Sequence, residues 1–144
     1  MVIISHRGNI GGADPEVENK PEQIDLVIEE YGWDVEVDLW KIGDKFFLGH
    51  DEPQYEVTWD WLWERSNSLW IHCKNGDALI ETYQMFNTFW HQKDDYTLTS
   101  TNWIWAYPGI EVPEPARAIA VMPEENFNVG WFGGVCTDNP EWYA

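Results

Sequence analysis

Residues 33–39 read Trp-Asp-Val-Glu-Val-Asp-Leu, and this alternation decides the fold of the chain. Apolar and acidic residues follow one another with a period of two, which is typical of a β-strand with one apolar face. The same period places Glu36 and Asp38 together on the other face. Neighbouring carboxylates repel each other, and the pKa of one rises unless a cation intervenes. The stretch therefore predicts either a solvated face of an edge strand or a site for Mg²⁺, Ca²⁺ or Mn²⁺.

Short apolar and β-branched runs predict strands along the rest of the chain. Besides the strand at residues 34–39, seven more are expected, at residues 2–5, 45–48, 69–73, 96–99, 103–106, 117–122 and 133–137. Helices are expected at residues 22–30, 58–66 and 77–90, and none after residue 95. No linker or repeat of fixed period interrupts the chain, so its 144 residues predict a single domain spanning residues 1–144.

Imidazole and guanidinium side chains follow two of the predicted strands. His6 and Arg7 end the first run, and His50 follows a hairpin-like stretch that turns at residues 43–44. Asp51 comes directly after His50 and could orient its imidazole. Imidazole titrates near neutral pH and suits a general acid or base, while a guanidinium neutralises phosphate. Together with the carboxylate pair, these residues predict a phosphate ester hydrolase.

Four short motifs occur in a defined order along the first 51 residues, namely His6-Arg7-Gly8, Glu18-Asn19, Glu36-x-Asp38 and His50-Asp51. Their order and spacing resemble those of the glycerophosphodiester phosphodiesterase family, within the phosphatidylinositol-phospholipase-C-like superfamily. Residues 134–140, Gly-Val-Cys-Thr-Asp-Asn-Pro, are similar to the closing strand and turn of that family. The resemblance implies a (β/α)8 barrel. A complete barrel takes about 250 residues, so we expect an α/β fold, a trimmed (β/α)8 TIM-type barrel with several outer helices missing.

The resemblance implies catalytic roles for four residues. His6 and His50 match the two catalytic histidines of the family, and Arg7 matches its phosphate-binding arginine. Lys74 matches a lysine that follows the third metal ligand of the family. We expect one histidine to deprotonate the attacking oxygen and the other to protonate the leaving alcohol, while Arg7 and Lys74 neutralise charge at phosphorus.

The resemblance also implies a metal site. Glu36 and Asp38 match two metal ligands of the family, but His72 stands where a third ligand, an acid, is expected. Imidazole ligates metals too, and the exchange would shift preference toward Mn²⁺ and away from Ca²⁺. The alternatives are a weakened metal site or a structural histidine at a strand end. Glu18 is interpreted as support near the metal, and Asn19 as a helix cap.

These residues together predict metal-dependent hydrolysis of a small glycerophosphodiester-like phosphodiester to a phosphomonoester and an alcohol, as in lipid metabolism. The attacking oxygen could be water or a neighbouring substrate hydroxyl, and the latter would give a cyclic intermediate. Two other functions stay open. One is a lyase that stops at the cyclic phosphate, and the other is a catalytically degenerate barrel that binds a phosphorylated sugar or polymer.

Composition limits the partners and the location. The formal net charge of −18 argues against nucleic acid and against anionic membrane surfaces, because both would repel the protein. No apolar run approaches the length of a membrane span. A candidate catalytic residue already stands at position 6, so no cleaved leader is expected, and the cytoplasm is predicted. The two cysteines, Cys73 and Cys136, are expected to be buried reduced thiols.

Eleven tryptophans remain to be placed. Trp59, Trp61 and Trp63 could form a platform for a sugar or a choline-like group, but core packing is the favoured interpretation. Residues 96–131 show strand patterns and tryptophans without a helix to cover them. Exposed apolar surface favours association, so a homo-oligomer that buries part of this region is predicted.

Overall fold

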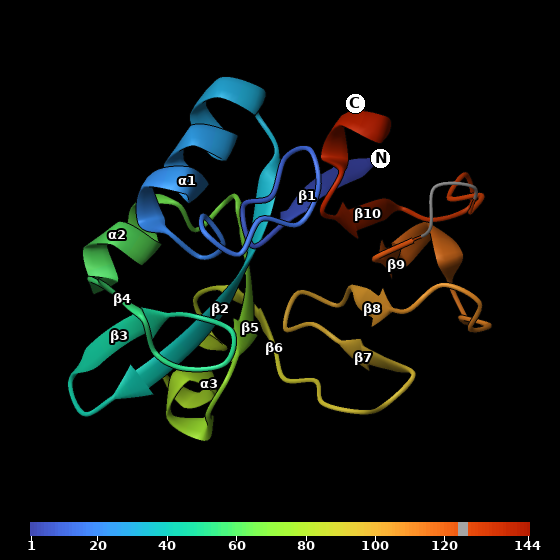
Figure 1. The fold of residues 1–144 in the computed structure, drawn as a ribbon. Helices are drawn as coiled ribbons and strands as arrows, with labels where there is room; N and C mark the ends of the chain where they lie inside the picture. Colours follow the sequence, from blue (N-terminus) through green and yellow to red (C-terminus); the bar gives the residue numbers. More distant parts are fainter. Residues whose placement is uncertain (124–126) are drawn as a thin grey trace.

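The structure, a computed structural model, describes residues 1–123 and 127–144 (Figure 1). Within these residues one curled sheet of ten strands forms the body of the molecule. The strands are β1 (Val2–His6), β2 (Asp34–Ile42), β3 (Lys45–Leu48), β4 (Tyr55–Val57), β5 (Leu69–Cys73), β6 (Asn87–Phe89), β7 (Tyr96–Leu98), β8 (Ile104–Ala106), β9 (Ala118–Val121) and β10 (Gly134–Thr137). The helices are α1 (Pro21–Leu26), which continues as the π-helical turn η1 (Val27–Tyr31), α2 (Trp59–Glu64) and α3 (Gly76–Thr82), with the 3₁₀ turns η2 (Pro115–Arg117) and η3 (Pro140–Trp142).

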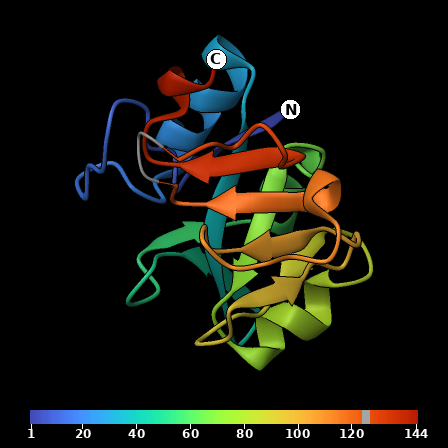
Figure 2. The same ribbon diagram turned by 90° about the vertical axis from the view of Figure 1, so that its right-hand side faces the viewer.

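Parallel pairing joins most of the strands in the order β6-β5-β2-β1-β10-β9-β8, and the last three lie side by side in Figure 2. Antiparallel strands extend the sheet at two places, where β7 pairs with β8 and where β3 and β4 follow the second half of β2. The register places His6 opposite Glu36, and Asp38 opposite His72. Residues from three strands therefore meet at one place on the sheet.

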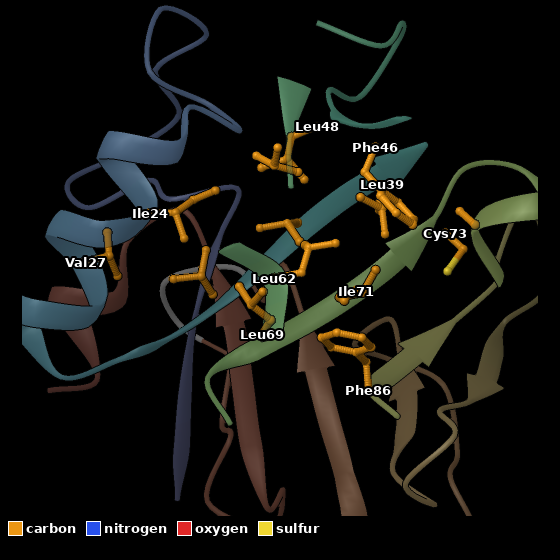
Figure 3. Close-up of a cluster of buried hydrophobic side chains, with 14 residues drawn as sticks. Ile24, Val27, Leu39, Phe46, Leu48, Leu62, Leu69, Ile71, Cys73 and Phe86 are labelled. Atoms are coloured by element: carbon orange, nitrogen blue, oxygen red, sulfur yellow. The ribbon is translucent and has the colours of Figure 1, made fainter. Parts of the chain in front are cut away.

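The alternation in β2 determines which face of the sheet receives the helices. Val35, Val37 and Leu39 point to one face, where they form a core with Ile24 of α1 and Leu62 of α2 (Figure 3). Full burial of such an aliphatic side chain contributes about 1.5–3 kcal/mol. The opposite, inner face of the curl holds a more aromatic cluster, composed of Ile4, Trp70, Phe89, Trp105, Ile119, Val121 and Cys136.

The expected trimmed (β/α)8 TIM-type barrel is wrong. The molecule is a curled half-barrel of mixed strands, because the hairpins of β2, β3 and β4 and of β7 and β8 take the place of strand–helix–strand units. In the described residues no α-helix follows α3, and only 3₁₀ turns occur after β6. A closed barrel needs eight parallel strands, each followed by a helix, and 144 residues are too few for that.

The predicted helix at residues 77–90 is wrong in its second half. α3 ends at Thr82, and Asn87–Phe89 forms β6, which pairs in parallel with β5. Phe86 is buried in the helix-covered core although it lies outside the helix. The apolar spacing correctly predicted that Phe86 is buried. It did not predict the strand, because the backbone groups of β6 form their hydrogen bonds with β5, and this pairing does not depend on the local sequence period.

The other elements lie close to their predicted places. All eight predicted strands are present, as β1, β2, β3, β5, β7, β8, β9 and β10, while the short strands β4 and β6 were not predicted. Trp59 and Trp61 pack against the helix-covered core, which supports the packing interpretation. None of the helices in the described part of the chain has the length and hydropathy that crossing a membrane requires.

Loops cover the outer face of β8 and β9, which the sequence pattern left without a cover. Val112 and Phe132 pack there against Ala106, Ala118 and Ile104. Some apolar side chains of this region still face solvent, since Leu98 is 60% exposed and Trp131 is 77% exposed.

Candidate metal and catalytic site

Three potential metal ligands converge on the inner face of the sheet. Glu36 and Asp38 come from β2 and His72 comes from β5, and one ligand atom of each lies within 4.8 Å of the others. The alternation of β2 and its parallel register with β5 produce this arrangement. The sequence prediction that these residues share one site therefore agrees with their placement.

The orientation of His72 directs one nitrogen to the carboxylates. Its Nε2 lies 3.0 Å from the backbone oxygen of His91, and its ring stacks on Phe89 with centroids 4.9 Å apart. A carbonyl oxygen only accepts, so Nε2 carries the hydrogen. Nδ1 then faces Asp38 Oδ1 at 3.3 Å and Glu36 Oε1 at 3.8 Å. A cation between these atoms would meet the lone pair of Nδ1 in neutral imidazole together with both carboxylate oxygens, which is the geometry of a ligand set. Without a cation, the contact with Asp38 is favourable when Nδ1 carries a hydrogen and donates it to Oδ1.

The burial of the two carboxylates indicates whether a metal ion would suit this cluster. Asp38 is 0% exposed and Glu36 is 2% exposed. Among the described residues, Asp38 Oδ1 and Glu36 Oε2 are buried without a hydrogen-bond partner. Unsatisfied buried carboxylate oxygens are costly, and a divalent cation would satisfy both. The donor set, two carboxylates and one imidazole nitrogen, therefore fits a divalent metal of the Mn²⁺ type.

The pKa values of the two acids are shifted in opposite directions. Burial raises the pKa of Glu36, and the charge of Asp38 raises it further. Burial also acts to raise the pKa of Asp38, but His72, the Arg7 guanidinium and the amide of Asn19 outweigh it, so that pKa is lowered. Asp38 therefore stays ionised, while ionisation of Glu36 is disfavoured until a cation lies beside it. A metal at this cluster would lower the raised pKa of Glu36, because a cation favours the charged carboxylate.

Asn19 and Arg7 hold Asp38 in place. The Asn19 amide donates to Asp38 Oδ2 at 3.0 Å, and Asn19 Oδ1 accepts from the backbone N–H of Asp38. Arg7 Nε lies 3.2 Å from Asp38 Oδ2, and Arg7 Nη1 lies 3.2 Å from Glu18 Oε2. The prediction that Asn19 caps a helix is wrong, because the N-cap of α1 is Lys20, whose side chain makes no capping hydrogen bond. Glu18 supports Arg7 rather than touching the three ligands.

Several residues around this site have a strained backbone conformation. Four non-glycine residues of the described chain have a left-handed backbone, and three of them, Arg7 (φ 56°), Asn19 (φ 60°) and Met122 (φ 51°), border the site. Each such residue costs on the order of 1–3 kcal/mol, and strain of this kind is concentrated at functional sites.

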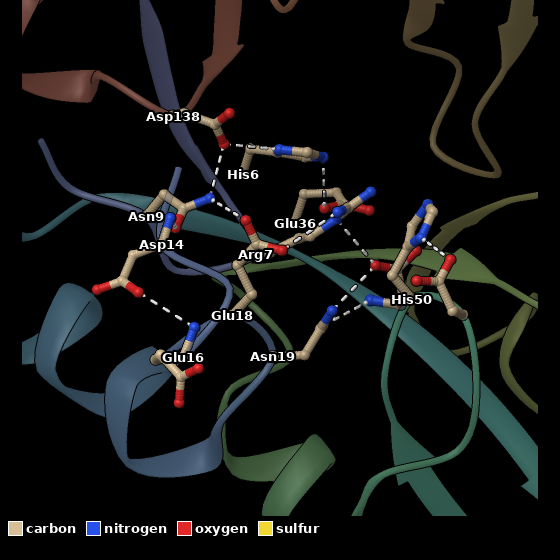
Figure 4. A network of polar contacts seen from close by, with 12 residues as sticks. His6, Arg7, Asn9, Asp14, Glu16, Glu18, Asn19, Glu36, His50 and Asp138 are labelled. Atoms are coloured by element: carbon tan, nitrogen blue, oxygen red, sulfur yellow. Dashed lines mark hydrogen bonds and ion pairs between the residues drawn. The ribbon is translucent and has the colours of Figure 1, made fainter. Parts of the chain in front are cut away.

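A histidine–carboxylate pair flanks the cluster (Figure 4). His6 Nδ1 lies 2.8 Å from Asp138 Oδ1, and the Asn9 amide donates to the same oxygen at 2.7 Å. The other ring nitrogen of His6 faces Glu36 Oε2 at 3.8 Å. Burial opposes protonation of His6, but the hydrogen bond to Asp138 and the charge of Glu36 outweigh it and raise the pKa of His6. The pKa of Asp138 is lowered, because its bonds to His6 and Asn9 outweigh its burial.

Asp138 and Asn9 are the site residues that sequence reasoning missed. Asp138 directly follows β10, which is parallel to β1, so it lies at the same edge of the sheet as His6. Its position at the carboxyl end of a strand was the available signal. The partner could not be read locally, since 132 positions separate the two residues.

The remaining predicted residues border the same region. His50 Nδ1 lies 2.8 Å from Asp51 Oδ1, as the sequence predicted, although both side chains are exposed. Lys74 Nζ lies 3.7 Å from Asp38 Oδ1. A cavity of about 150 Å³ is lined by polar residues, namely His6, Arg7, Glu36, His50 and His72, and by mainly aromatic and apolar ones, namely Phe89, His91, Trp105, Tyr107, Val121 and Met122. The structure thus brings together all seven predicted site residues.

Comparison of the chain with models of protein families, with curated proteins and with solved structures finds no match. The resemblance to the glycerophosphodiester phosphodiesterase family therefore rests on the quoted motifs alone. Function has to be argued from the chemistry of the site.

Proposed function

We propose that the protein hydrolyses a small glycerophosphodiester-like phosphodiester with the help of a divalent metal. One observation carries the proposal. Glu36, His72, His6 and Arg7 line one small cavity, and Asp38 and Asp138 lie directly behind them, although these residues come from three strands and two loops. A cavity of about 150 Å³ suits a phosphate with a short alcohol rather than an acylated lipid.

Glu36, Asp38 and His72 would hold the metal. When bound, a divalent ion supplies Lewis-acid polarisation of a phosphoryl oxygen. The buried position of the ligands keeps competing water away, and Arg7, Lys74 and Asn19 keep Asp38 oriented. These contacts fix the charge of the site before substrate arrives, which is the condition for electrostatic stabilisation of a transition state.

The two histidines are arranged for proton transfer. In both, a carboxylate binds Nδ1, that of Asp138 for His6 and that of Asp51 for His50. Each pair fixes the tautomer, so Nε2 is the nitrogen that exchanges a proton with substrate. One Nε2 takes the proton of the attacking oxygen, and the other gives a proton to the oxygen of the leaving alcohol as its bond to phosphorus breaks.

Arg7 supplies the phosphate-binding cation. Its Nε and Nη1 are directed to Asp38 and Glu18, while Nη2 has no partner within the described residues. That nitrogen can donate to a phosphate oxygen with the rest of the guanidinium held rigid, which reduces the entropy lost on binding.

Location and assembly belong to the same proposal. Two buried cysteines without a disulfide are compatible with a reducing compartment such as the cytoplasm. The exposed side chains of Leu98 and Trp131 are the apolar surface that a homo-oligomer would bury. Sedimentation at rising salt tests this, because screening of the net charge of −18 should tighten association.

The test of the activity is turnover of glycerophosphocholine and of an aryl phosphodiester with Mn²⁺, Mg²⁺ or Ca²⁺, followed by phosphorus NMR. A phosphomonoester product is expected, and accumulation of a cyclic phosphate would identify a lyase instead. His6→Ala serves as the inactive control and Lys45→Ala, a change at an exposed residue of β3, as the active one. No turnover with any of the three ions would overturn the proposal.

A further inference from the structure

A groove of about 390 Å³ lies at the end of the sheet opposite the metal-ligand cluster. The first residues of three neighbouring parallel strands line it, namely Asp34 of β2, Leu69 of β5 and Asn87 of β6. The metal ligands of β2 and β5 lie further along these strands, so the two sites occupy different ends. The proposed hydrolysis makes no use of this groove.

The groove is lined by side chains that bind hydroxyl groups. Besides the aromatic Trp70 and Tyr83, six of its residues carry neutral hydrogen-bonding groups: Ser66, Asn67, Gln84, Asn87, Ser100 and Thr101. In the described part of the chain Asp34 is the one charged residue of the lining, although the sequence contains 26 acidic and 8 basic residues. Among the residues that the structure describes, no lysine, arginine or histidine lines the groove, so these residues offer no cation for a phosphate or a carboxylate. The lining therefore favours a polar ligand without charge.

Part of the hydrogen-bonding capacity of these groups is unused. Trp70 Nε1 donates to Asp34 Oδ2 at 2.9 Å, and within the described residues the other oxygen of Asp34 has no partner. The same holds for the side chain of Asn67. A carboxylate accepts hydroxyl hydrogens, and an amide both donates and accepts. Tyr83, which is 46% exposed, adds a ring face for the C–H surface of a ligand.

Internal hydrogen bonds hold the walls of the groove in position. Ser100 Oγ donates to the backbone oxygen of Phe86 at 2.8 Å and accepts from the N–H of Thr88 at 2.9 Å. Thr101 Oγ1 donates to Asn87 Oδ1 at 2.7 Å, which leaves the amide N–H groups of Asn87 for a ligand. Groups that are already ordered lose little entropy on binding, so the groove is prepared for a ligand.

We propose that this groove binds a neutral saccharide of one or two rings. Asp34, Asn67 and Asn87 would hold ring hydroxyls, and one C–H face of the sugar would lie on Tyr83. A saccharide is the ligand class that combines several hydroxyls with an apolar face and carries no charge. The volume falls within the range of small-molecule sites, about 300–1,000 Å³. The inference is independent of the proposed hydrolysis.

The test uses the full chain, labelled with ¹⁵N and titrated with glucose, galactose, mannose, N-acetylglucosamine, maltose and cellobiose. Each sugar is added to about 50 mM, since ligands with few contacts bind in the millimolar range. At least one sugar should produce saturable shifts in the side-chain amide signals of Asn67 and Asn87 and in the indole signal of Trp70. Absence of saturable shifts with every sugar, or displacement of the sugar by inorganic phosphate, overturns the proposal.

Variants locate the binding. Tyr83→Ala and Asn67→Ala should each weaken the sugar at least tenfold, and both change exposed residues, so the fold should persist. Tyr96→Ala is the matched control, because Tyr96 is similarly exposed, at 43%, and lies outside the groove on β7. Equal affinity in the Tyr83 and Tyr96 variants would place the sugar elsewhere and contradict the assignment.

Discussion

Asp38→Asn and Glu36→Gln each remove one carboxylate from the same face of β2, yet we expect opposite effects on the stability of the metal-free protein. Asp38 is fully buried, and its oxygens lie 3.2 Å from Arg7 Nε and 3.3 Å from His72 Nδ1. Removing one member of a buried ion pair costs about 3–5 kcal/mol, because the partner charge stays behind. In a chain of 144 residues this should lower Tm by roughly 10 °C.

Glu36→Gln should leave the metal-free protein as stable as before or more stable by about 1 kcal/mol. Burial and the charge of Asp38 raise the pKa of Glu36 above its ordinary 4.5, so ionisation of Glu36 costs the folded protein free energy that a neutral glutamine does not. A carboxyl whose folded-state pKa is raised makes the protein less stable as the pH rises above the unfolded value. The advantage of the variant should therefore grow from about pH 4.5 toward neutral pH.

Thermal unfolding followed by circular dichroism measures both effects, in chelator and in Mn²⁺. At a hundred times its dissociation constant the metal should stabilise the unmodified protein by about 2.7 kcal/mol, and both variants should lose most of this gain. Equal stabilities of the two variants in chelator would refute the assignment of charge to Asp38. A full Mn²⁺ gain in both would show that the cluster is not the metal site.

Three further perturbations test the surroundings of the cluster. Asp138→Asn should lower the pKa of His6, because the carboxylate that raises this pKa against the effect of burial is removed. Turnover should fall about a hundredfold or more. An unchanged His6 titration by NMR would contradict this prediction. In the unmodified protein the stability from this pair should be present at acidic pH and lost as the pH rises through the His6 pKa. His72→Glu should shift the metal preference from Mn²⁺ toward Mg²⁺ or Ca²⁺ in thermal-shift assays, and an unchanged profile would place His72 outside the ligand set. Iodoacetamide should label neither cysteine of the folded protein, because burial raises the pKa of Cys73 to about 11 and that of Cys136 well above its usual range; mass spectrometry showing rapid labelling would refute this.

Local patterns were sufficient for the strands but not for the sheet. Apolar runs and alternation depend on neighbours in the sequence, and all eight predicted strands lie close to their expected positions. The barrel was wrong because strand edges are chemically alike, so sequence does not tell which edges pair. β7 pairs antiparallel with β8, and β3 with β2, where a barrel would have continued in parallel. The strand at residues 87–89 was missed for the same reason, because its pairing with the edge of β5 cannot be recognised from the sequence.

The sequence by itself determined that Glu36 and Asp38 share a face, because side chains alternate in any strand. It also placed His6 and Arg7 directly at a strand end. Only the tertiary structure decided that Asp138 holds His6, that the pKa of Asp38 is lowered and that the pKa of Glu36 is raised. Burial and hydrogen-bond partners set these properties, and both come from segments far apart in the sequence that meet only when the sheet has formed.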